Sequence, residues 1–136
     1  MPSAGPEQTK RIVVIVWAAL LASVGLHFML TRVLPPPALV PDSQLPAPLL
    51  VLAIAAALGS FYFKARFGVR GDQLRPLAMV RAAYIMALVF SEIPSLLGLV
   101  LFFTVNWPRT WLFFGISALA FAINFPSSDD FDSLKN

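Results

Sequence analysis

Apolar residues gather into four long runs along this chain, separated by polar or proline-rich stretches. The runs cover residues 12–31, 49–63, 82–105 and 110–125. A bilayer-spanning helix needs roughly twenty predominantly apolar residues. The pattern therefore predicts an all-α, polytopic membrane protein in which four transmembrane helices form an antiparallel bundle.

The second and third runs also carry small residues at helical spacing. Small residues four positions apart let helix backbones approach closely. In the second run they are Ala53, Ala57 and Gly59, and in the third run they are Ala83, Ala87, Ser91, Ser95 and Gly98. We expect both stripes to pack against other helices. The second run is short for a hydrocarbon core of about 30 Å, so its helix would either be tilted little or thin the bilayer locally.

The segments between the runs differ in composition. Residues 34–48 hold six of the twelve prolines, which predicts an extended linker because proline lacks the amide hydrogen of a helix. Residues 106–110 form a tight turn, where Trp107 and Trp111 suit the interfacial aromatic belt. Residues 1–11 are expected to be a flexible N-terminal segment, and residues 126–136 an acidic cytoplasmic tail.

Positive charge is unevenly distributed among these segments. The chain has ten Lys and Arg residues against seven Asp and Glu, and five of the ten lie between the second and third runs: Lys64, Arg66, Arg70, Arg75 and Arg81. Because cytoplasmic loops are rich in Lys and Arg, we expect this loop and both termini to be cytoplasmic, in a bacterial inner membrane. The same charges could hold anionic lipid headgroups, although topology alone explains them. We expect no nucleic-acid partner.

The first run has a second interpretation, as a secretory signal peptide with a faint cleavage site at Ser23-Val24-Gly25. The apolar residues continue past that site to Leu30, which is longer than a signal core. We therefore expect a retained first helix.

Few residues of this chain could take part in catalysis or bind a metal ion or cofactor. The chain has no cysteine and one histidine, which excludes disulfides, thiolate sites and a multi-histidine metal site within one chain. We expect no cofactor and no catalytic site. His27 is interpreted as an interfacial histidine, or alternatively as a proton-entry or quinone-contacting group. An enzyme site would need Glu92, His27, Asn106 and Asn124 to converge, but the predicted topology places His27 and Asn106 on the outer side, away from Asn124.

Glu92 is the candidate functional residue, because it lies near the middle of the third run. An acid at the centre of a transmembrane helix costs roughly 3 kcal/mol, which the surrounding Leu, Ile, Val and Phe offset at about 0.3–0.6 kcal/mol each. An ionisable group at that depth faces protein or trapped water. We expect the Glu92 carboxyl to carry its proton at neutral pH, because burial disfavours the charged form.

Pro94 lies two residues after this acid, where it should kink the helix. It leaves the Phe90 carbonyl without a helical donor, within reach of the carboxyl. Ser91 and Ser95 supply hydroxyls beside it. Glu92, Ser91, Ser95 and Phe90 therefore form the candidate proton or ion site.

The hairpin from the second to the third run resembles the ATP-synthase subunit c (proteolipid) family. The alternating small residues from Ala53 to Gly59 stand for that family's glycine motif, Arg75-Pro76 for its polar loop, and Glu92 followed by Gly98-Leu99-Val100 for its second helix. The resemblance implies that Glu92 is the family's proton or sodium carrier. With an extra helix on each side, the whole chain is similar to small four-helix bacterial membrane proteins.

Three functions remain open from the sequence. The first is a non-enzymatic accessory or assembly subunit of a larger membrane complex, with membrane lipids and other subunits or a second copy as partners. The second is a proton or cation carrier that uses Glu92. The third is a membrane enzyme acting on lipid or quinone, which lacks a convergent set of polar groups.

Overall fold

The computed structural model describes residues 5–67 and 76–132, and every regular element in these ranges is helical. In chain order the helices are α1 (Pro6–Val33), α2 (Pro46–Phe67), α3 (Leu77–Val105), α4 (Trp111–Ile123) and α5 (Ser128–Asp132). The first three are long and apolar enough to cross a membrane, whereas α4 is shorter. The prediction of an all-helical membrane protein is confirmed.

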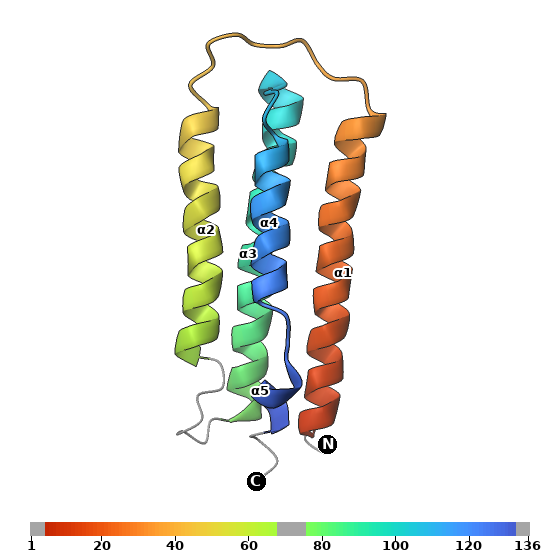
Figure 1. The fold of residues 1–136 in the computed structure, drawn as a ribbon, viewed down its shortest axis with the longest axis vertical. Coiled ribbons are helices and arrows are strands. Elements are labelled where there is room, and N and C mark those ends of the chain that lie inside the picture. Colours follow the sequence, from red (N-terminus) through yellow and green to blue (C-terminus); the bar gives the residue numbers. More distant parts are fainter. Residues whose placement is uncertain (1–4, 68–75, 133–136) are drawn as a thin grey trace.

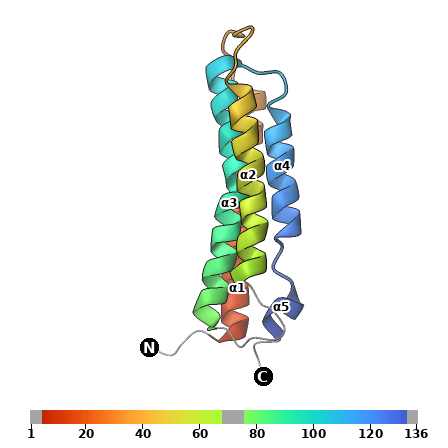
Figure 2. The same cartoon turned by 90° about the vertical axis from the view of Figure 1, so that its left-hand side faces the viewer.

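The helix α3 is the centre of the structure. It packs against α1, α2 and α4, and Figures 1 and 2 show α1 and α2 on opposite sides of the α3–α4 pair. Twelve of the 29 residues of α3 are buried, but only three of the 28 residues of α1. The first helix is therefore the least embedded of the long helices.

The helix α1 begins at Pro6, inside the segment that was predicted to be flexible. Proline is favourable at the first position of a helix because its missing amide hydrogen would have no partner there. Glu7 in the first turn faces the positive end of the helix dipole. These local preferences, rather than hydropathy, extend the helix beyond its apolar run.

The helix α2 is also longer than its apolar run. It covers 22 residues, or about 33 Å at 1.5 Å per residue, which matches a hydrocarbon core of about 30 Å. Ala53 and Ala57 are buried, and Gly59 lies against the Phe90 ring of α3. The predicted bounds of 49–63 are therefore too short: Pro46 and Pro48 are tolerated in the first turn, and the helix continues through Lys64 and Arg66 to Phe67.

The helix α4 has only 13 residues, or about 20 Å, so it ends part of the way along the bundle. Figure 2 shows the chain leaving α4 and reaching α5 near the end of the molecule where the termini lie. A Cβ atom on Gly98 would lie 2.8 Å from the Cβ of Phe113, so α3 and α4 are in close contact at this glycine.

The proline-rich linker rests on the end of α3. The Val40 amide donates to the Val105 carbonyl at 3.2 Å, and Asn106 Nδ2 donates to the Pro37 carbonyl at 2.9 Å. Asn106 caps α3 with a φ of 48°, a left-handed conformation that asparagine tolerates better than most residues. The helix α3 continues through Pro94, and the kink there stays a prediction.

The predicted tail contains α5, which packs on the bundle. Phe131 is buried and stacks on Tyr84 of α3 at a centroid distance of 5.4 Å, and the Tyr84 hydroxyl donates to the Asp130 carboxylate. Trp17 Nε1 of α1 donates to the Phe121 carbonyl at 2.9 Å. These contacts hold the C-terminal part of the chain against α1 and α3.

Candidate functional site

Glu92 lies one residue past the midpoint of α3 and is half-buried. Its Oε1 atom accepts a hydrogen bond of 2.6 Å from the Ser23 hydroxyl of α1. The carboxyl therefore faces the protein at the interface between α1 and α3, with a hydroxyl partner from another helix.

His27 reaches the same interface from α1. Its Nδ1 atom is 3.1 Å from Ser95 Oγ, and its Nε2 atom is 3.5 Å from Ser23 Oγ. Ser23 and His27 are four residues apart, and Glu92 and Ser95 are three apart, so each pair occupies one face of its helix. We name Ser23, His27, Glu92 and Ser95 the polar clamp.

Both serine hydroxyl hydrogens of the clamp are donated to oxygen atoms of Glu92. Ser23 donates to Glu92, and Ser95 donates to the Glu92 main-chain carbonyl at 2.9 Å. Both serine oxygens can then act only as acceptors toward the His27 ring. Donation from both ring nitrogens requires the imidazolium form, whereas neutral imidazole can serve one contact only. The clamp thus contains an acid and a base bridged by hydroxyl groups.

A second polar group lies between α2, α3 and α4. Asn124 Nδ2 donates to Ser60 Oγ at 2.9 Å and to Ser91 Oγ at 3.1 Å, while Ser117 donates to the Ser91 carbonyl. All four residues are buried, and we name them the serine–asparagine cluster. Within the described residues, Asn124 Oδ1 has no hydrogen-bond partner.

The two groups are neighbours on α3, since Ser91 and Ser95 are one helical turn apart. Asn124 contacts Ser91, one helical turn along α3 from the Ser95 that His27 contacts, so it lies in the interior of the bundle. The physical reason is the shortness of α4, which ends beside Ser91 in the interior rather than at the far surface. Each group nevertheless has its own partners, and no hydrogen bond between described residues joins them directly.

The four residues predicted as one site face three directions. Glu92 and Ser95 face α1, whereas Ser91 donates to the Ala87 carbonyl and accepts from Asn124. The Phe90 ring packs toward α2, with its centroid 5.1 Å from that of Phe63. The small-residue stripe Ala83, Ala87, Ser91, Ser95 and Gly98 is buried throughout.

The basic residues have local roles where the structure describes them. Lys64 Nζ donates to the Ile123 and Phe125 carbonyls at 3.3 and 3.4 Å, which supplies donors at the open end of α4. Arg66 lies 5.9 Å from the centroid of the Phe67 ring, and Arg81 lies in the first turns of α3. Arg70 and Arg75 lie outside the described residues.

Ser23 is the clamp residue that sequence reasoning missed, and His27 was placed without its partners. One signal was available, because Ser23 and His27 are polar residues four apart in an otherwise apolar run. That spacing puts them on one helix face. It does not say which of the other helices this face meets.

The fold and these polar groups define an integral membrane protein with polar side chains held between its helices. Among the described residues, no group of three His, Cys, Asp or Glu side chains could hold a metal ion. In comparisons with known proteins, no family model, curated protein or solved structure matches this chain. The similarity of the hairpin to ATP-synthase subunit c therefore stays a prediction.

Proposed function

We propose that this chain is a non-enzymatic integral membrane protein that acts as an accessory or assembly subunit of a larger membrane complex. In this proposal α1, α2 and α3 each cross the bacterial inner membrane, and α4 together with the segment that leads to α5 makes the fourth crossing, with both termini in the cytoplasm. The distribution of basic residues supports this orientation. The start of α1, the end of α2 and the start of α3 lie at one end of the bundle (Figure 1), and these segments contain Lys10, Arg11, Lys64, Arg66 and Arg81. Arg32 lies at the opposite end of α1, and Arg109 immediately precedes α4.

The observation that carries the proposal is the attachment of α1. This helix buries three residues but exposes large apolar side chains, among them Ile15 at 67% and Leu26 at 60%. Glu92 meets a serine hydroxyl of its own chain, an arrangement suited to anchoring α1 on α3. The helix α1 is held by these polar contacts and by apolar packing around Val13 and Val24, and its exposed apolar side chains leave surface for a neighbouring transmembrane helix.

The test is site-specific photo-crosslinking in native membranes, with a photoreactive residue at Ile15 or Leu26 of α1. We expect a discrete crosslinked protein, either a partner subunit or a second copy. Val51 of α2, which is 69% exposed, is the matched control on the other side of the bundle. Crosslinks to lipid alone from every position would contradict the proposal.

A proton carrier is the second candidate, and the presence of His27 in the polar clamp favours it. Chains of Asp, Glu and His side chains within the membrane are typical of proton pathways. The bridge from His27 through Ser23 to Glu92 would let a proton move between base and acid by exchange of hydroxyl hydrogens.

Proteoliposomes separate the two candidates. A carrier should acidify or alkalinise the lumen in response to a membrane potential, and Glu92→Gln should abolish this while keeping the acceptor for Ser23. Reaction of Glu92 with a hydrophobic carbodiimide should depend on pH. Absence of both proton movement and labelling would exclude the carrier and leave the anchoring role.

A further inference from the structure

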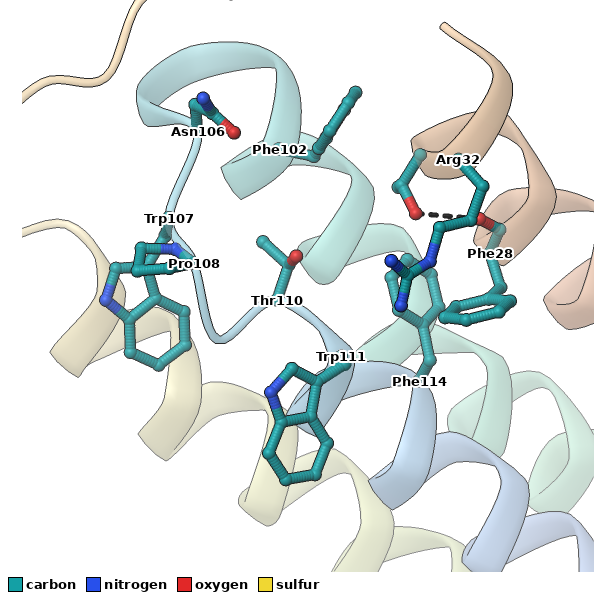
Figure 3. Close-up of a pocket in the computed structure, with 10 residues that line it drawn as sticks. Phe28, Arg32, Phe102, Asn106, Trp107, Pro108, Thr110, Trp111 and Phe114 are labelled. Carbon is teal, nitrogen blue, oxygen red and sulfur yellow. Dashed lines mark hydrogen bonds between the residues drawn. The ribbon is translucent and has the colours of Figure 1, made fainter. Parts of the chain in front are cut away.

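A cavity of about 150 Å³ opens where α1 ends and α4 begins, away from the polar clamp. Figure 3 shows residues of α1, α3, α4 and the connecting turn around it. None of the four clamp residues lines it. Neither the accessory role nor the carrier role uses this cavity.

The chemistry of the cavity favours an anion. The Arg32 side chain extends from α1 toward Phe114 of α4, and its guanidinium carbon lies 5.1 Å from the centroid of the Phe28 ring (Figure 3). The described residues that line the cavity include no Asp or Glu. Arg32 is exposed, and its guanidinium has donors that match the oxygens of a phosphate group.

The size of the cavity limits what can enter it. A volume of 150 Å³ corresponds to about five water molecules at roughly 30 Å³ each, which is enough for a phosphate group. Pockets for whole drug-sized ligands are about 300–1,000 Å³. Only the charged part of a larger molecule therefore fits, and the rest must lie outside.

The surroundings indicate a lipid as that larger molecule. Trp107 and Trp111 line the cavity, and tryptophan is enriched at the level of lipid headgroups. Leu26 and Met29, which are 60% and 55% exposed, lie within two turns of Arg32 on α1. Their apolar surface is available to acyl chains whose headgroup is at Arg32.

We propose that this cavity binds the phosphate group of a phospholipid, with Arg32 as the principal donor and the acyl chains along the exposed surface of α1. The site rests on the membrane location of the chain. The site is independent of Glu92, so an experiment that disproves the carrier role or the accessory role does not disprove the lipid site.

Native mass spectrometry of the full chain in detergent tests the site. Phosphatidylglycerol is added as the probe, and diacylglycerol with the same acyl chains is the arm without phosphate. We expect one retained phosphatidylglycerol per chain and no retained diacylglycerol. Arg32→Gln should weaken retention about tenfold, because it removes charge-assisted hydrogen bonds. Arg109→Gln, an exposed arginine outside the cavity lining, should leave it unchanged.

Three outcomes would overturn the site: equal loss in both arginine variants, equal retention of diacylglycerol, or retention that survives Arg32→Gln. A further sample with inorganic phosphate tests whether the cavity binds a free ion instead of a lipid headgroup. Displacement of the lipid by phosphate at the same concentration would assign the cavity to the free ion and overturn the lipid assignment.

Hydrogen exchange of the wild-type protein gives a second measurement that needs no variant. Phosphatidylglycerol should slow amide exchange around residues 28–32 and 110–114 at least severalfold relative to diacylglycerol. Equal exchange with the two lipids would overturn the proposal even if Arg32→Gln did not fold.

Discussion

The Ser23 hydroxyl of α1 donates a hydrogen bond of 2.6 Å to Oε1 of Glu92 in α3, across 69 positions of sequence. This contact and the one between His27 and Ser95 add to the limited apolar packing of α1, which buries three residues. Polar contacts between transmembrane helices contribute about 0.6 kcal/mol on average and up to about 1.7 kcal/mol.

The first prediction concerns Ser23→Ala. We expect it to lower the free energy of unfolding by about 0.6–2 kcal/mol, because the Glu92 carboxyl loses its donor in a water-poor interface. Reversible unfolding in mixed micelles measures the change. Thr104→Ala is the control, because Thr104 is exposed and its hydroxyl donates to the Val100 carbonyl of its own helix. Equal effects of the two substitutions would contradict a specific role of the clamp.

The second prediction compares two glycines. Gly98→Ala would place a Cβ atom 2.8 Å from the Phe113 Cβ, so α3 and α4 must separate, at a cost of about 1–3 kcal/mol. Gly115→Ala meets no atom within 4 Å and should be neutral or stabilising by up to about 1 kcal/mol. Thermal unfolding in one detergent ranks the two variants. A Gly98→Ala protein as stable as Gly115→Ala would show that the α3–α4 contact is looser than the 2.8 Å separation implies.

The third prediction concerns Lys64, which donates to the last carbonyls around the end of α4. Lys64→Met keeps an unbranched side chain but removes the donor, so the end of α4 should open more often. We expect amide exchange of residues 121–125 to rise several-fold. Exchange in the centre of α3 should stay unchanged. Arg11→Gln removes an exposed positive charge elsewhere and should not alter exchange in 121–125; if it does, net charge rather than capping is responsible.

The fourth prediction concerns Asn124→Leu. The change removes two donors, but Ser60 and Ser91 keep their bonds to the Ala57 and Ala87 carbonyls. It also removes Oδ1, a buried acceptor without a partner in the described part of the chain. We therefore expect a change in unfolding free energy within about 1 kcal/mol, despite complete burial of the residue. A loss above about 3 kcal/mol would mean that Asn124 organises this region beyond its hydrogen bonds.

The sequence predicted several residues of the site, but it did not predict which residues they contact. Glu92 stands out because an acid in an apolar run is costly wherever the helix packs. Its partner Ser23 could not be assigned, because apolar residues surround the whole circumference of α1 and do not reveal which face meets α3. The same limitation hid the separation of Ser91 from Ser95 into two polar groups.

Helix existence and membrane character follow from the sequence alone, because the cost of placing backbone and side chains in lipid depends on local composition. The tertiary structure decided which helix faces Glu92, where α4 ends inside the bundle and what Lys64 contacts. These features depend on the rotation and depth of each helix. Both are set by packing and hydrogen bonds between residues distant in the chain, which hydropathy does not encode.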